Sequence, residues 1–240
     1  MSSRARLLLI AFFGLAALVC ARLGIWQVQR LHERRAANAV ALAARAQDPV
    51  RLDSVMAGDS SLIERHVLVR GRYDHARDIV LRGRAYQGSP GVEIVTPLVL
   101  EGGRAAVLVS RGFVPAPDAA SVLTDSLREP GLVTVKGLAL ALPSGQGVPL
   151  ERPGGITWAR LDLEALGDRM PYTLAPIYIR QEPDARLPRF PRRLEPPPID
   201  DGPHLNYAIQ WFSFAVMAVG FGIVVWRQQR ERGKDERERD

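Results

Sequence analysis

The chain has 240 residues, of which 47% are hydrophobic, and its formal net charge is +6. This length fits one domain with accessory segments, and this hydrophobic fraction excludes a disordered chain. The single cysteine, Cys20, excludes an intrachain disulfide and a thiolate metal cluster. The basic residues gather beside two apolar segments near the chain ends, and no motif for reading DNA or RNA is present, so we expect no nucleic-acid partner.

The first apolar segment follows a short N-terminus, residues 1–6. Residues 7–21 carry no charge, and Arg22 and Trp26 then have the character of residues at a membrane interface. We predict a transmembrane helix over residues 7–26. A cleaved signal peptide is the alternative, but no small-residue cleavage site precedes residues 27–47, whose Ala, Arg, Leu and Gln content predicts a helical extension of the span.

A soluble domain is predicted over residues 48–182. Alternating or β-branched runs between turn signals predict strands over 67–73, 79–84, 92–100, 105–114, 133–140 and 176–181. Asp162 is a candidate N-cap of a short helix that ends at Met170. Residues 115–131 and 143–155 are rich in Pro, Gly, Ser and Asp and predict loops. We expect a mainly β (α+β) domain outside the membrane, with an antiparallel sheet of the barrel or sandwich type.

The C-terminal part begins with a proline-rich connector, residues 183–203, which we expect to be stiff and extended. Residues 204–226 predict a second transmembrane helix, because no formal charge occurs from Tyr207 to Trp226 and this length spans roughly 30 Å as a helix. Residues 227–240 alternate in charge sign and predict a solvated, partly helical tail.

The local charges conflict about membrane topology. Around the first span, the basic residues after it outnumber those before it and favour an outside N-terminus, whereas the charges around the second span favour an inside C-terminus. Two spans put both ends of the chain on one side, and long domains cross a membrane largely regardless of charge. We therefore expect both termini in the cytoplasm and the domain on the other side.

Candidate functional residues gather where the second apolar segment begins. His204, Tyr207 and Trp211 follow the spacing i, i+3 and i+7, which places them on one helix face. A neutral imidazole there is a candidate axial ligand for haem iron, with the two aromatic rings packing against the porphyrin. An ordinary interfacial belt of aromatic residues is the alternative that these residues leave open. Because no catalytic motif is present, we expect no enzymatic activity.

Five short motifs occur in an order that is similar to one known family. They are Gly24–Arg30 (GIWQVQR), Val69–Asp74 (VRGRYD), Gly91–Leu98 (GVEIVTPL), Leu108–Pro115 (LVSRGFVP) and His204–Phe212 (HLNYAIQWF). Together they resemble the Surfeit-locus-one family of cytochrome oxidase assembly factors. Ser110 and Phe113 stand where the family usually has Asn and Trp.

The resemblance implies a protein of an inner membrane, with both termini in the cytoplasm or matrix and the domain on the other side. The sequence begins directly with its first span and shows no long transit peptide, so we expect a bacterial inner (plasma) membrane and a periplasmic domain. The resemblance also implies a role in delivering haem a to subunit I of an aa3-type cytochrome oxidase, with haem a bound through His204. Subunit I is then the expected protein partner, with a haem a synthase as a further candidate and lipid as the surrounding medium. A haem-free scaffold that holds subunit I during assembly is the alternative.

Two further pairs of motif residues are candidates for a role. Trp26 and Arg30 lie one helical turn apart, so they are candidates for contact with haem propionates or an acidic partner. An aromatic and basic membrane border is the alternative. Arg111 and Gly112 are expected at the end of a central strand, where they either pin the domain onto the helix ends or form a turn.

Overall fold

The computed structural model describes residues 3–52, 59–145, 147–152 and 155–237. The chain forms two compact units. We call them the helix pair, which comprises Met1–Val40 and Ile199–Asp240, and the β domain, Ala41–Pro198.

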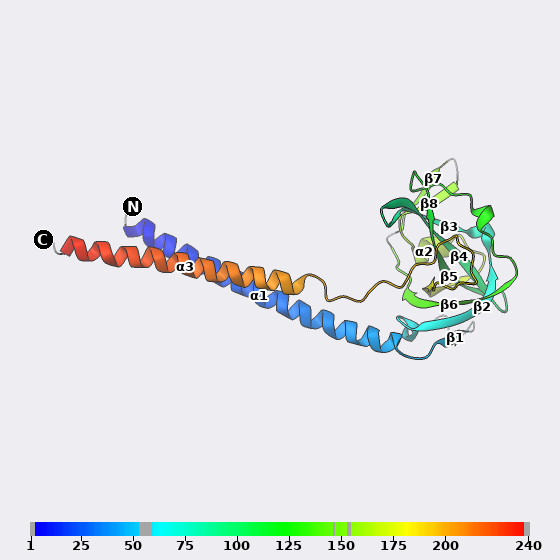
Figure 1. Cartoon of the computed structure of the whole chain (residues 1–240), viewed down its shortest axis with the longest axis horizontal. Helices are drawn as coiled ribbons and strands as arrows, with labels where there is room; N and C mark the ends of the chain where they lie inside the picture. The colour runs from blue at the N-terminus through cyan, green and yellow to red at the C-terminus, as the bar shows by residue number, and fades with distance from the viewer. Residues whose placement is uncertain (1–2, 53–58, 146, 153–154, 238–240) are drawn as a thin grey trace. The chain divides into compact units, whose positions relative to one another are not determined.

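The helix pair consists of α1, Ser3–Arg45, whose last residues belong to the β domain, and α3, His204–Arg237. Both helices are long and apolar enough to cross a membrane, over Leu7–Arg45 and His204–Gln228. The helices are antiparallel, because His204 contacts Gln27 while the Phe221 ring stacks on Phe13 with the ring centroids 5.7 Å apart. The two chain termini therefore lie at the same end of the pair (Figure 1).

The contact between α1 and α3 follows a seven-residue spacing. On α1 the buried residues Ala17, Gly24, Leu31 and Asn38 are each separated by seven positions, a spacing typical of helices packed nearly parallel or antiparallel. Gly24 allows a close approach, since a Cβ atom there would lie 2.7 Å from the ring of Phe212 on α3. Gly24 thus lets α3 pack directly against α1 at Phe212.

Nine strands are described in the β domain. They are β1 Val50–Leu52, β2 His66–Tyr73, β3 Ile79–Tyr86, β4 Ser89–Leu100, β5 Ala105–Pro115, β6 Leu132–Ala141, β7 Pro149–Arg152, β8 Gly155–Trp158 and β9 Thr173–Gln181. Their order is β1-β2-β6-β9-β5-β4-β3-β8-β7, and an additional pairing of β2 with β4 closes the central strands into a barrel. The barrel closes at Gly71, which pairs with both Val133 of β6 and Leu100 of β4.

The prediction of two apolar helices flanking a mainly β domain is confirmed, and of the two expected sheet types the structure has the barrel. Most neighbouring strands are antiparallel, whereas β1–β2, β3–β8 and β5–β9 are parallel. The six predicted strands are β2, β3, β4, β5, β6 and β9. The loop prediction over residues 143–155 is wrong at Pro149–Arg152, which forms β7 and pairs with β8.

Asp162 is the N-cap of a short helix, as predicted. Its carboxylate accepts hydrogen bonds from the backbone N–H groups of Glu164 and Ala165 at the start of α2, Leu163–Gly167. The helix is shorter than expected and ends before Met170. It packs with neighbouring residues against a second apolar cluster, outside the barrel, that includes Leu108 and Trp158.

The barrel interior is filled by apolar side chains from all five closing strands. The buried members are Leu52, Leu62, Val67, Val69, Tyr73, Leu98, Leu100, Val107, Val109, Val135, Ala139, Ala175, Ile177 and Ile179. In β2, buried residues alternate with more exposed ones. Successive side chains of a strand point to opposite faces of the sheet, so the buried residues of β2 face the barrel interior. The first part of the proline-rich segment also belongs to the β domain, because the backbone of Arg192 exchanges two hydrogen bonds with that of Phe113.

Candidate functional site

His204 begins α3 and lies against α1. Its Nδ1 atom is 2.9 Å from Oε1 of Gln27, a residue that is 8% exposed in the helix contact. Because an amide oxygen only accepts hydrogen bonds, Nδ1 is the donor in this contact, and in a neutral ring Nε2 is then the nitrogen with the lone pair. Among the residues that the structure describes, Nε2 has no hydrogen-bond partner. The imidazole is therefore oriented by one ring nitrogen and able to bind a metal through the other.

A second set of contacts holds the start of α3 in place. Asn38 donates from Nδ2 to the carbonyl oxygen of Asp200 (2.8 Å) and to Oδ1 of Asp201 (3.1 Å). The Arg35 side chain forms an ion pair of 2.8 Å with Asp201, and this hydrogen bond lowers the pKa of the Asp201 carboxyl. These contacts join α1 to the residues immediately before α3. They fix the position from which His204 reaches Gln27.

Tyr207 and Trp211 follow His204 on α3, as the spacing predicts. Tyr207 is 47% exposed, while Trp211 is half-buried and packs edge to face on Phe214, with centroids 5.9 Å apart. An exposed phenol and a partly exposed indole give this turn of the helix flat apolar surface next to the imidazole.

Trp26 and Arg30 contact each other, with the guanidinium carbon 5.8 Å from the indole centroid. Arg30 also forms an ion pair of 2.7 Å with Glu33, and both side chains of that pair are more than half exposed. Within the described part of the helix pair, neither Trp26 nor Arg30 makes a hydrogen bond or ring contact with His204. The structure thus brings His204 together with Gln27 and leaves Trp26 and Arg30 as a separate exposed pair.

Arg111 lies in β5, where the pairing of β5 with β4 changes register. Ile94 pairs with Gly112 and Val95 with Ser110, so Arg111 has no partner residue in β4. Such a bulge re-aims a side chain, and the Arg111 side chain is fully buried within the β domain. Because β5 continues beyond both residues, the expectation that Arg111 and Gly112 end the strand is wrong.

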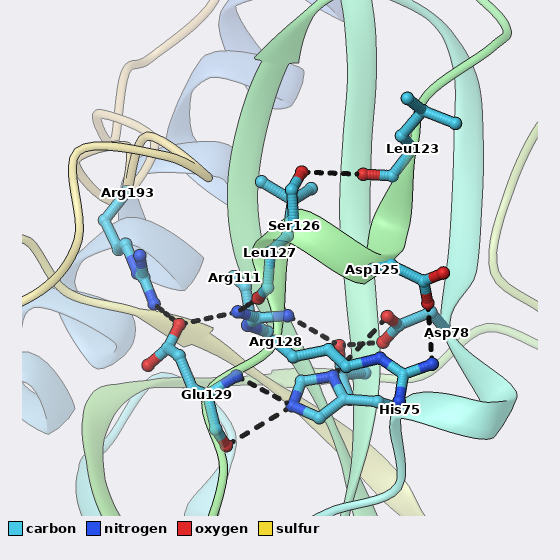
Figure 2. A network of polar contacts seen from close by, with 11 residues as sticks. His75, Asp78, Arg111, Leu123, Asp125, Ser126, Leu127, Arg128, Glu129 and Arg193 are labelled. Carbon is cyan, nitrogen blue, oxygen red and sulfur yellow. Dashed lines mark hydrogen bonds and ion pairs between the residues drawn. The ribbon is translucent and has the colours of Figure 1, made fainter.

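Arg111 is held by a network of polar groups, shown in Figure 2. Its Nη2 atom donates to the carbonyl oxygen of Leu127 and to Oε1 of Glu129 (2.6 Å). Its guanidinium carbon lies 5.1 Å from the Tyr73 ring centroid. Arg193, which is also buried, donates to the same oxygen of Glu129. One carboxylate therefore compensates two buried guanidinium groups.

Neighbouring charges set the pKa values in this network. Burial raises the pKa of Glu129, but its hydrogen bond and charge pairing with Arg111, together with Arg193, outweigh burial and hold the pKa below its usual value. Burial raises the pKa of Asp78, which accepts a hydrogen bond from Thr96. The network thus contains one carboxyl group with a lowered pKa, which favours ionisation, and one with a raised pKa, which resists it.

Gly112 is adjacent to this network and contacts the proline-rich segment. Its φ angle is +117°, and a Cβ atom there would lie 2.0 Å from the carbonyl oxygen of Arg192. Arg193 donates to the carbonyl oxygen of Pro191 (2.9 Å) and to Oε1 of Gln181 (2.9 Å). The Arg111–Gly112 motif therefore fastens this segment to the barrel.

Sequence reasoning did not single out Gln27, Glu129 or Arg193. Gln27 had a signal, because it is a polar residue of the motif Gly24–Arg30 that lies three residues after a glycine on the same helix face. Glu129 and Arg193 had none, since they lie in segments with the composition of a loop and a connector.

The structure combines a β barrel with two helices that are long and apolar enough to cross a membrane, and this combination suggests a membrane protein with a separate β domain. The model of the SURF1 family matches residues 14–216. The chain belongs to the SURF1 family. This is the family of cytochrome oxidase assembly factors that its motifs resemble.

Several known proteins are similar along most of the chain. A SURF1-like protein of Monosiga brevicollis is 24% identical over 222 residues, which cover 88% of this chain and 84% of that protein. A SURF1-like protein of Mycobacterium tuberculosis is 30% identical over 175 residues, 71% of this chain and 63% of that protein. Surfeit locus protein 1 of Rattus norvegicus is 25% identical over 206 residues, 80% of this chain and 67% of that protein.

Proposed function

We propose that the protein assists the delivery of haem a to subunit I of an aa3-type cytochrome oxidase, and that it holds haem a through Nε2 of His204. The observation that carries this proposal is the 2.9 Å contact of His204 Nδ1 with Gln27 Oε1. A hydrogen bond at one ring nitrogen fixes the tautomer and makes the other nitrogen a better ligand.

A single oriented imidazole suits haem better than a bare metal ion. Among the described residues, no group of three or more His, Cys, Asp or Glu side chains could hold a metal ion. The porphyrin supplies four ligands to haem iron, so one protein nitrogen is sufficient to anchor it. Tyr207 and Trp211 offer flat surface on the same helix face, and Trp26 with Arg30 is a further candidate contact for a propionate or a protein partner.

The same proposal gives the protein a place in the cell. Two apolar helices with both chain ends at one end of the pair support two membrane spans with the termini on one side. We propose that the termini lie in the cytoplasm and the β domain in the periplasm of a bacterial inner membrane. Subunit I and a haem a synthase are the proposed partners. The protein would bind and pass on its cargo without catalysing a reaction.

The test is an absorption spectrum of the full chain purified from cells that make haem a. We expect bound haem in the wild type and its loss in His204→Ala. Gln27→Ala keeps His204 but removes the hydrogen-bond partner that orients its imidazole ring. This variant should bind haem about tenfold more weakly, because losing a group that orients a metal ligand usually has an effect of that size. His32→Ala is the matched control, because His32 is an exposed histidine of the same helix pair.

The possible outcomes distinguish haem delivery from the role of a haem-free scaffold. Wild-type haem content in His204→Ala would remove His204 from the site. A colourless wild-type protein that still copurifies with subunit I would support the haem-free scaffold instead.

A further inference from the structure

Gly202 lies two positions before His204, in the exposed turn that precedes α3. Its φ angle is +68°, and a Cβ atom there would lie 3.5 Å from Cδ2 and 3.7 Å from Nε2 of His204. The other atoms of the imidazole ring are more than 4 Å from that position. A side chain at residue 202 would therefore stand beside the Nε2 end of the ring, next to the nitrogen that is free to bind a metal.

The missing side chain of Gly202 leaves this end of the ring open. An imidazole binds a metal along the lone pair of its free nitrogen, and haem iron sits at the centre of a broad, flat porphyrin. The porphyrin therefore needs free space on every side of that lone pair. Because only Cδ2 and Nε2 are within 4 Å, the Cβ position is level with Nε2 or beyond it toward the lone pair. A methyl group at this position would meet the porphyrin.

Hydrogen bonds hold the turn in place, so it does not simply move aside. Asn38 of α1 is 8% exposed, and its Nδ2 atom donates to the carbonyl oxygen of Asp200 and to Oδ1 of Asp201. Oδ1 of Asp200 in turn accepts a hydrogen bond of 2.9 Å from the backbone N–H of Gly202. The backbone of Gly202 is thus fixed on one side of Nε2, while Gln27 orients the ring of His204 from α1.

We propose that Gly202 is a specificity-determining residue of the haem site, because its lack of a side chain gives a planar metal macrocycle access to Nε2 of His204. The inference rests on the proposed function, in which His204 binds haem. It adds a second requirement to that site. Besides an oriented imidazole, the site needs a fixed turn without a side chain at residue 202.

The test is a titration of the full chain in a neutral detergent with haem a, followed by its absorption spectrum. Gly202→Ala should bind haem a at least about tenfold more weakly than the wild type, the effect expected when a methyl group overfills a fitted site. The methyl group would touch the imidazole at an ordinary van der Waals distance, so the ring should keep its place. In haem-free protein labelled with ¹⁵N at its four histidines, NMR should show the same His204 tautomer as in the wild type.

Two further variants separate the methyl group from strain in the backbone. Gly103 has a similar φ angle, +72°, but nothing lies within 4 Å of its Cβ position, so Gly103→Ala should bind haem a like the wild type. Asn adopts a positive φ more readily than Ala. Gly202→Asn should therefore fold even if Gly202→Ala does not, and it should also bind haem a at least about tenfold more weakly.

Failure of this inference can be told apart from failure of the proposed function. A wild type that binds no haem a overturns both. Wild-type affinity in a folded Gly202→Ala or Gly202→Asn protein, or an equal loss in Gly103→Ala, overturns the role of Gly202 alone. A different His204 tautomer in Gly202→Ala would mean that the methyl group displaces the ring instead of blocking the porphyrin, and this result also overturns the inference.

Discussion

Glu129 is the residue on which the buried charges of the β domain depend. It is 13% exposed and pairs with Arg111 and Arg193, which are almost completely buried. Glu129→Gln leaves both guanidinium groups without a counter-charge, and breaking a buried ion pair costs about 3–5 kcal/mol. We therefore expect a loss of about 3 kcal/mol in the free energy of unfolding, measured by urea denaturation of the full chain in detergent.

The matched control for this change is Asp125→Asn. Asp125 pairs with Arg128, and both side chains are more than half exposed, so its loss should cost less than about 1 kcal/mol. Equal effects of the two variants would show that the Glu129 network contributes no more than a surface pair.

Gly112 has both a positive φ angle and a crowded Cβ position, whereas Gly131 has only the positive φ angle. Gly131 also has a positive φ, +92°, but nothing lies within 4 Å of the position of its Cβ atom. Gly131→Ala should therefore cost only the backbone strain, about 1–2 kcal/mol. Gly112→Ala must in addition displace the Arg192 backbone and its two hydrogen bonds, worth about 1 kcal/mol each.

The measurement is the difference in urea midpoint between the two glycine variants. We expect Gly112→Ala to be the less stable by about 2 kcal/mol, and limited proteolysis should cut its proline-rich segment first. If the two variants are equally stable, the contact with Arg192 does not hold that segment.

At the scale of elements, the antiparallel packing of α1 and α3 can be tested by a crosslink. A Cβ atom at Gly222 would lie 3.6 Å from the Cβ of Phe13, within the range of a disulfide. In a Cys20→Ser background, Phe13→Cys with Gly222→Cys should form an intramolecular disulfide on mild oxidation. The two helices should then stay joined after proteolytic cleavage of the chain between them.

Phe12 supplies the control for the crosslink, because it is adjacent in sequence and 62% exposed. Phe12→Cys with Gly222→Cys should crosslink much less, since its side chain points away from α3. Comparable crosslinking of both pairs would contradict the helix contact that carries His204 to Gln27.

Local patterns predicted the elements whose residues alternate strictly. β2 was recognised because its buried positions alternate along the strand, and Asp162 because an N-cap is a local feature. β7 was missed because Pro149 and the charged residues near it have the composition of a loop. Alternation is the same in parallel and antiparallel strands, so the parallel pairing of β5 with β9 had no sequence signal.

The residues of the candidate site also fall into two groups, those with a local sequence signal and those that only the packing brings together. His204 was a candidate from the sequence because an imidazole is unusual where an apolar helix begins, and its role as a ligand stays a prediction. Its partner Gln27 is 177 positions away, and only the packing of α1 against α3 brings the two together. An arginine in a strand is normally expected at the surface, so nothing in the sequence predicted that the Arg111 side chain is fully buried in the β domain.

At the scale of the whole molecule, the lowered pKa of Glu129 makes stability depend on pH. A carboxyl group whose pKa is lower in the folded state stabilises the fold above its unfolded pKa, about 4.3 for Glu, and this contribution is lost as the pH falls through the folded pKa. Asp78 acts in the opposite direction, because burial raises its pKa and its protonated form favours the folded state.

We therefore expect the urea midpoint of the full chain to fall between about pH 5 and pH 3, read by near-ultraviolet circular dichroism. Glu129→Gln cannot titrate at this position, so its midpoint should start lower and fall less over the same range. Asp78→Asn removes the group that opposes the loss, so its midpoint should fall more steeply than that of the wild type. Parallel curves for all three proteins would mean that neither buried carboxyl group controls the acid stability, and that exposed carboxylates such as Asp118, whose pKa is lowered to about 2 by hydrogen bonds from Ser121, are responsible instead.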